Sequence, residues 1–172
     1  MHDRTMSPTQ RLRRTWFAAV AWIVLMVSQP GQVLAAAGTG QTARIAAAAE
    51  TFLATLDDAQ RGRVSFALDD AAQRKRWSNL PVNMAERRGL RLGDLRPNQR
   101  DAAMQVLAAA LSRMGYEKVV GIVESDEVLR KEGGSNAPPF GRDEFFISFM
   151  GKPSVTAPWM IQFGGHHLAL NI

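Results

Sequence analysis

The spacing of apolar residues changes once along the chain, and this change constrains the fold more than any other feature. Between residues 95 and 130, apolar side chains recur every three or four positions, which is typical of amphipathic helices. From residue 145 onward they recur at every second position, which is typical of strands with one buried face. A polar segment rich in Gly and Pro, residues 133–139, separates the two parts. Helices followed by strands predict an α+β fold.

The first part of the chain is predicted to be mainly helical. Pro97 suits the first position of a helix, and Gly115 is expected to end that helix with a left-handed residue. A short alternating run at residues 64–68 is the exception and predicts a strand. Helical segments are expected over residues 42–56, 57–61, 95–115 and 116–130.

The second part predicts three strands, over residues 145–149, 159–163 and 166–172. Turns at 151–154 and 164–165 would join them as a three-stranded antiparallel meander. The last run reaches Ile172 without a turn or a polar tail, whereas most domains end in a few loose residues. We therefore expect a truncated chain and a sheet that is incomplete at its C-terminal edge.

The start of the chain has the pattern of an export signal. Four arginines precede residues 16–27, which form an uncharged apolar run. At about 1.5 Å per residue this run covers roughly 18 Å, too little for a membrane core about 30 Å thick. Residues 1–35 are thus predicted to be a cleaved signal peptide, 36–41 a flexible spacer, and 42–172 a single partial α+β domain. The protein is expected to be periplasmic or secreted, without a stable membrane anchor after cleavage.

Composition excludes several classes of site and partner. The chain has no cysteine, which excludes disulfides, thiolate zinc sites and cysteine nucleophiles. The formal charge of +5 would favour a nucleic-acid partner. However, residues 1–35 hold four arginines and one aspartate, and the remainder has 17 basic and 15 acidic residues. A net charge of +2 without a large basic cluster does not predict nucleic-acid binding.

The most distinctive motif is Gly165 followed by His166 and His167. On a regular strand, neighbouring side chains point to opposite faces, so His166 would share a face with Leu168 and His167 with Asn171. The two imidazoles could not then bind one ion side by side. We expect His166 to be a buried, hydrogen-bonded imidazole and His167 to be accessible.

Two functions remain open for this motif. In the first, His167 is a catalytic base or a metal ligand, and carboxylates such as Asp70 and Asp143 complete a divalent-metal site for hydrolysis. The substrate would be a small or extracytoplasmic molecule. In the alternative, both histidines are structural, the acidic residues belong to turns, and the domain is a non-catalytic binding or envelope-interaction module.

A second group of residues, around Trp77, predicts a ligand-binding site. Trp77 lies next to basic residues and just before a Ser-Asn-Leu-Pro loop, which is unusual for a core tryptophan. Its flat face, with Arg88 and Asn171 as polar partners, would suit a sugar or an aromatic ligand. The other aromatic residues are expected to belong mainly to the core.

The order of these motifs resembles a family of mostly bacterial proteins catalogued as domain of unknown function 3500. The resemblance covers nearly all of residues 42–172, and its most specific part is the Gly-His-His-Leu segment at 165–168. Met160 departs from the family pattern, where a glycine usually follows the tryptophan. Members continue well past this motif, which implies a missing C-terminal half, and the resemblance implies no particular activity. It rests on Phe52, Leu56, Asp57, Gln60, Arg61, Phe66, Asp69, Asp70, Trp77, Asn79, Leu80, Pro81, Arg88, Gly89, Leu90, Leu95, Gln99, Arg100, Leu111, Ser112, Gly115, Tyr116, Phe149, Gly151, Pro153, Pro158, Trp159 and residues 165–171.

Overall fold

The computed structural model describes residues 30–172, so most of the predicted signal peptide lies outside the described part. Helix α2 (Pro30–Ala54) opens this part and includes residues 36–41, for which the sequence predicts a flexible spacer. Residues Thr39–Ile172 form one compact unit. Within residues 30–172, no helix combines the length and the apolar character that crossing a membrane requires.

The centre of the compact unit is a five-stranded mixed sheet. Its strands are β1 (Ser65–Phe66), β2 (Leu90–Arg91), β3 (Phe146–Met150), β4 (Met160–Gly165) and β5 (Leu168–Asn171). Their order is β1-β3-β4-β5, with β1 parallel to β3, β2 antiparallel to β3, and the pairs β3–β4 and β4–β5 antiparallel. The predicted α+β class is confirmed, but the prediction of a sheet made only of a three-stranded antiparallel meander is wrong. The strand predicted at residues 64–68 contains β1, but the sequence did not show that it pairs with β3. The two residues of β2 are too few to show an alternating pattern, so this strand was not predicted.

The last hairpin turns two residues later than the sequence predicts. Gly164 and Gly165 belong to β4, and Gly165 pairs with Leu168 across the hairpin. His166 and His167 therefore form the turn instead of starting a strand. His167 adopts the left-handed backbone conformation, with a φ of 59°.

Four helices follow the predicted segments with shifted ends: α2, α3 (Asp58–Val64), α5 (Pro97–Ala110) and α6 (Arg113–Glu132). The short helix α4 (Ala71–Arg74) was not predicted. Pro97 stands in the first turn of α5, as predicted. Gly115 does not end a helix: it lies in the first turn of α6, where its N–H donates to the Ser112 hydroxyl. Two short 3-10 turns, η2 (Leu92–Asp94) and η3 (Arg142–Glu144), lie in the same part of the chain.

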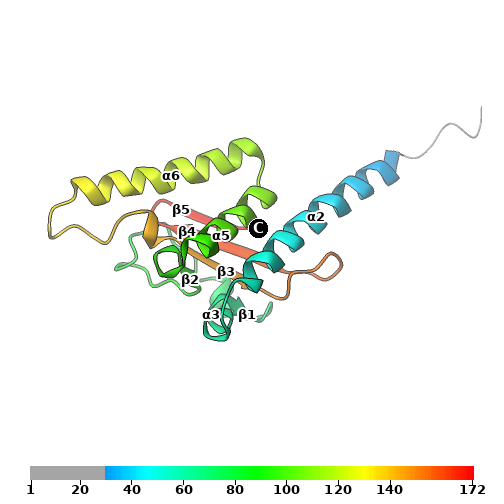
Figure 1. Cartoon of the computed structure of the whole chain (residues 1–172), viewed down its shortest axis with the longest axis horizontal. Coiled ribbons are helices and arrows are strands. Elements are labelled where there is room, and N and C mark those ends of the chain that lie inside the picture. Colours follow the sequence, from blue (N-terminus) through cyan, green and yellow to red (C-terminus); the bar gives the residue numbers. More distant parts are fainter. Residues whose placement is uncertain (1–29) are drawn as a thin grey trace, which may run out of the picture. The chain divides into compact units, whose positions relative to one another are not determined.

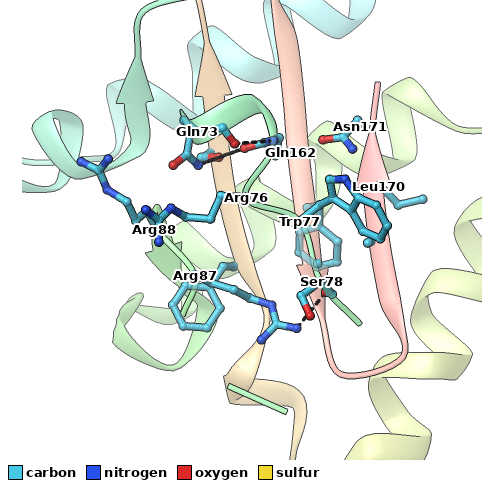
Figure 2. A pocket seen from close by; sticks show the side chains of 14 residues that line it. Gln73, Arg76, Trp77, Ser78, Arg87, Arg88, Gln162, Leu170 and Asn171 are labelled. Carbon is cyan, nitrogen blue, oxygen red and sulfur yellow. Dashed lines mark hydrogen bonds between the residues drawn. The ribbon is translucent and has the colours of Figure 1, made fainter. Parts of the chain in front are cut away.

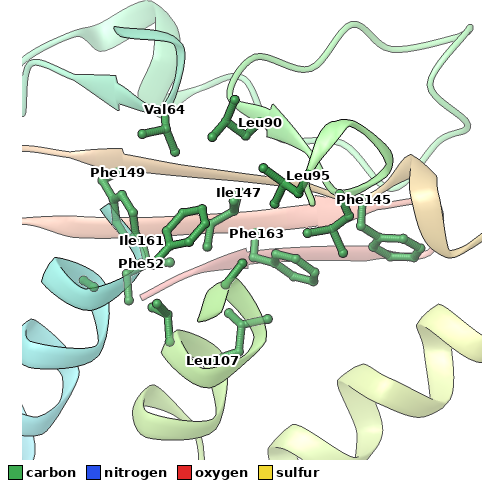
Figure 3. Close-up of a cluster of buried hydrophobic side chains, with 14 of the residues drawn as sticks. Phe52, Val64, Leu90, Leu95, Leu107, Phe145, Ile147, Phe149, Ile161 and Phe163 are labelled. Atoms are coloured by element: carbon green, nitrogen blue, oxygen red, sulfur yellow. The ribbon is translucent and has the colours of Figure 1, made fainter. Parts of the chain in front are cut away.

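One face of the sheet carries the hydrophobic core. Alternate residues of β3 and β4 point to this face, where Phe149 and Phe163 are almost fully buried. Phe52 of α2 and Leu107 of α5 pack against them (Figure 3). The last turns of α2 and helix α5 cross the same side of the strands (Figure 1), so the helices cover the apolar face.

The opposite face of the sheet holds buried polar side chains and has a different cover. Ser148 and Gln162 alternate with the core residues of β3 and β4, and both are buried. Gln73 of α4 forms hydrogen bonds with them, so α4 lies against this face. The second face is therefore protected by a short helix and the loop after it.

Candidate functional site

A pocket opens between the polar face of the sheet and the segment that contains α4 and the loop after it. Its cavity is small, about 30 Å³, and opens to solvent. Trp77, Arg88 and Asn171, the three residues predicted to contact a ligand, all line it (Figure 2). We call it the Trp77 pocket. Its other lining residues are Gln73, Arg76, Ser78, Arg87, Phe146, Ser148, Gln162, Phe163, Gly164, Ala169 and Leu170.

Two glutamine amides connect α4 to the sheet in this pocket. Gln73 Nε2 donates to Gln162 Oε1 over 2.9 Å, and Gln162 Nε2 donates to the Gln73 carbonyl over 3.2 Å. The Ser148 hydroxyl donates to the same Gln162 oxygen over 3.3 Å. Buried amides that are paired in both directions fix the position of α4 on the sheet.

Two buried polar atoms in the pocket have no hydrogen-bond partner among the described residues. One is Oε1 of Gln73, an acceptor on a side chain that is 1% exposed. The other is Nε of Arg76, a donor. Buried polar groups are nearly always paired with protein, water or ligand, so these two atoms are exceptions, and both lie beneath the accessible surface.

Three arginines give the pocket a positive charge, and its lining includes no carboxylate. Arg76 pairs with the exposed Glu86 over 2.6 Å. Arg88 is exposed and packs over the ring of Phe66, with 4.9 Å between its guanidinium carbon and the ring centroid. The pocket therefore combines cationic groups with neutral amides.

Arg87 has a structural task in the same pocket. Its Nη2 lies within hydrogen-bond distance of the carbonyl oxygens of Ser78, Leu80 and Gly165. Burial lowers the pKa of Arg87, and the charge of Asp126 partly opposes this effect. The loop that contains Trp77 is thus bound to the end of β4 through hydrogen bonds of Arg87.

Trp77 leaves most of its side chain free for contact. It is 63% exposed, whereas the core aromatic residues are almost fully buried. In Figure 2, Trp77 lies toward the β5 side of the pocket, the side that Leu170 and Asn171 form. The prediction that Trp77 is not a core residue is confirmed by this exposure.

The histidine pair lies at the β4–β5 turn next to this pocket. His166 Nδ1 forms a 2.6 Å hydrogen bond with Oδ1 of Asp126, a carboxylate on α6 that is only 3% exposed. The His166 ring also contacts Phe140, with 4.8 Å between ring centroids. His166 is therefore a largely buried, hydrogen-bonded imidazole, as the sequence predicts.

His167 is exposed at the same turn. Its backbone N–H donates to the carbonyl of Asn79 over 2.8 Å, which ties the turn to the Trp77 loop. The His166 and His167 rings lie 3.9 Å apart, so the two imidazoles are neighbours and do not point to opposite faces. A turn, unlike a regular strand, does not alternate its side chains.

The residues predicted as metal ligands have other tasks. Asp70 caps α4 by accepting the N–H of Gln73 over 2.9 Å. Asp143 pairs with Arg100 over 2.7 Å. Within residues 30–172, no group of three or more His, Asp or Glu side chains is placed to hold a metal ion. The structure thus does not assemble His167, Asp70 and Asp143 into one centre.

Asp126 and Gln73 contribute to this site but were not predicted from the sequence as site residues. Asp126 follows Val119 and Val123 at helical spacing, and both valines are buried. A carboxylate on the apolar stripe of a helix predicts a buried partner, so this signal was available in the sequence. No comparable signal marked Gln73, because α4 has only four residues.

The site can be compared with known proteins. No curated protein and no solved structure matches the chain. The family model described as "Protein of unknown function (DUF3500)" matches residues 39–172. This range contains the whole compact unit, the Trp77 pocket and the Gly-His-His motif. It agrees with the resemblance drawn from the motifs, and the protein therefore belongs to the DUF3500 family.

Proposed function

We propose that the compact domain is a binding module for a small molecule and that the Trp77 pocket is its binding site. The supporting observation is convergence: Asn171 comes 83 residues after Arg88 in the chain, and it lines one pocket with Arg88 and Trp77. Trp77 is 63% exposed there, so its ring is free to contact a ligand. A mainly apolar hollow with a few convergent polar groups is the usual form of a ligand site.

The chemistry of the lining favours binding over catalysis in this pocket. Its polar side chains are amides, a hydroxyl and guanidinium groups. None of these groups readily gains or loses a proton near neutral pH, so they recognise a ligand without acting as acid or base.

Variants of the full chain test the binding site. We expect Trp77→Ala to abolish the ligand-induced thermal shift or nuclear magnetic resonance shifts found in a small-molecule screen. Met84→Ala is a matched control, because Met84 is 64% exposed but does not line the pocket. If hits bind equally well to both variants and to the unmodified chain, the Trp77 pocket is not the binding site.

We also propose that the protein is exported. The basic start and the apolar run at residues 16–27 support this proposal. Mass spectrometry of extracytoplasmic fractions should find a mature N-terminus near Ala36 or Gly38. Recovery of the protein there with residues 1–33 intact would contradict cleavage, and retention in the cytoplasm would contradict export.

A second candidate function is hydrolysis, with one histidine of the pair as general base. The hydrogen bond between His166 and the buried Asp126 supports it, because a carboxylate on one ring nitrogen fixes the tautomer and orients the other nitrogen. In this mechanism His166 takes the role that the sequence analysis gave to His167. Water would lose a proton to the imidazole and attack an acyl carbon, and the leaving oxygen would receive that proton.

A panel of chromogenic esters, with and without zinc or manganese, tests this candidate. Turnover that is lost in His166→Gln but kept in His167→Gln would support His166 as the base. Turnover that needs both a metal and His167 would instead support the metal-dependent hydrolase. Absence of turnover in the unmodified chain leaves the binding module as the function.

A further inference from the structure

We propose that residues 71–89, which run from α4 to the start of β2, bind reversibly to the surface of a membrane that contains anionic lipids. This inference goes beyond the binding function proposed for the Trp77 pocket, because it depends on Leu80 and Met84, which do not line that pocket. Two properties of the segment support it: its charge and its exposed apolar side chains.

The positive charge of the domain is concentrated in this segment. Residues 71–89 hold five basic residues and one acidic residue, whereas the rest of residues 36–172 holds twelve basic and fourteen acidic residues. The single acidic residue is already paired with an arginine of the same segment. Arg74, Lys75 and Arg88 are exposed, and none of them forms an ion pair within the described part of the chain. The segment is therefore complementary to an anionic surface.

Exposed apolar side chains are concentrated in the same segment. Among the side chains that the structure describes, eight large apolar ones are exposed, and three of these lie within residues 77–84. They are Trp77, Leu80 and Met84, which are 63%, 46% and 64% exposed. Single exposed apolar residues are common on protein surfaces, whereas a group of them beside basic residues is typical of segments that bind at a membrane interface.

The backbone of this segment is held in place while these side chains remain outside. The Leu80 carbonyl accepts a hydrogen bond from Arg87, and the Met84 N–H donates to the Pro81 carbonyl over 2.9 Å. Pro81 itself is buried, so the loop packs on the domain through this residue and leaves its two neighbours exposed. A surface whose backbone is already ordered loses little conformational entropy when it binds.

The combination of charge and apolar side chains favours a lipid surface over nucleic acid. Single-stranded nucleic acid pairs with basic residues and stacks on aromatic rings, which leaves Leu80 and Met84 without a role. A bilayer interface offers both kinds of contact. Its anionic headgroups attract the basic residues, and the boundary of its acyl chains accepts the Trp77 indole and the two aliphatic side chains.

Position-specific fluorescent labels on the full chain test the inference. The chain has no cysteine, so Met84→Cys provides a single attachment site for an environment-sensitive fluorophore. Met114→Cys is the matched control, because Met114 is 65% exposed but lies on α6. We expect vesicles of phosphatidylcholine with phosphatidylglycerol to shift the emission at position 84 to the blue, with little change at position 114. Each label reports only its own position, so contact of residues 1–35 with the vesicle does not imitate this result.

Variants of the chain labelled at position 84 separate the two contributions. Arg74→Gln combined with Lys75→Gln should lose most of the shift, because the attraction to the headgroups is reduced. Leu80→Ser should also reduce it, because an apolar contact is removed. Arg113→Gln, at an exposed arginine of α6, is the control for charge. None of these residues lines the Trp77 pocket, so failure of this inference and failure of the proposed small-molecule site are distinguishable.

Four outcomes would overturn the inference. Equal shifts at positions 84 and 114 would show that the segment has no particular contact with lipid. Equal shifts with neutral phosphatidylcholine vesicles and with anionic vesicles would remove the requirement for charge. A shift at position 84 with single-stranded DNA, and none with vesicles, would assign the surface to nucleic acid. A shift that follows the protein concentration alone would assign it to a second copy of the chain.

Discussion

His166 and Asp126 are 40 residues apart in the chain, and their side chains share a hydrogen bond of 2.6 Å. The other oxygen of Asp126 accepts the backbone N–H of Gly141 over 2.7 Å. One buried carboxylate on α6 therefore holds both the β4–β5 turn and the loop that precedes β3. This relationship makes the Gly-His-His motif part of the framework of the fold.

The first prediction compares the two histidines. His166→Ala should lower the free energy of unfolding by about 2–4 kcal/mol, because the Asp126 carboxylate stays buried and loses a partner. His167→Ala should change it by less than about 1 kcal/mol, since the exposed ring leaves no buried group unpaired. Urea denaturation measures both values. Equal losses would show that His167 carries structure as much as His166 does.

The second prediction concerns the stability of the domain at low pH. Hydrogen bonds from Arg130 hold the pKa of Glu127 at about 2, below its ordinary 4.5. A lowered pKa in the folded state stabilises the fold above the ordinary value, and this stabilisation is lost as pH falls from 4.5 toward 2. Glu127→Gln should therefore lower the unfolding midpoint near pH 7, with a smaller effect near pH 3.

A variant at another glutamate of α6 is the control for this pH-dependent stability measurement. Glu117 forms an exposed pair with Arg113, with Glu117 56% and Arg113 87% exposed. Exposed pairs contribute little to stability, so Glu117→Gln should leave the midpoint nearly unchanged at both pH values. A Glu127→Gln effect that is the same at both pH values would contradict the lowered pKa.

The third prediction explains the glycine of the motif. A Cβ on Gly165 would lie 2.5 Å from Cδ1 of the buried Phe145 ring. Gly165→Ala should therefore destabilise the domain by about 1–3 kcal/mol through overpacking. Gly62→Ala is the control: no heavy atom lies within 4 Å of that Cβ, and Gly62 stands inside α3. It should stabilise the domain by about 0.5–1 kcal/mol in thermal or urea unfolding.

The fourth prediction concerns Arg87. Its Nη2 lies within hydrogen-bond distance of the carbonyls of Ser78, Leu80 and Gly165. Its Nη1 donates to the carbonyl of Ala85, so two nitrogens of one rigid plane are used, and the single nitrogen of lysine cannot replace both. Arg87→Lys should cost about 1–3 kcal/mol of stability. It should also raise protease cleavage in the Trp77 loop, measured by limited proteolysis. Unchanged stability and cleavage would show that other contacts hold this loop.

Much of the local structure was predictable, because it depends on neighbouring residues. Pro97 starts a helix through its own fixed φ angle, and the alternation of Phe145, Ile147 and Phe149 identifies the buried face of β3. The exposure of Trp77 was likewise visible from the charged and loop residues around it. The turn at His166 and His167 was missed because two consecutive glycines, which belong to β4, resemble a turn more than the histidines do.

The periodicity of the chain predicts the α+β class, most of the helices and the buried face of the main strands. Long-range packing pairs β1 and β2 with β3, brings Asp126 to His166 and places the Trp77 loop against the sheet. Local periodicity follows from interactions within a few residues, and the sequence displays it directly. The sheet order and the pocket depend on which distant segments pack together, and that choice is made by the burial of the whole core and not by any one segment.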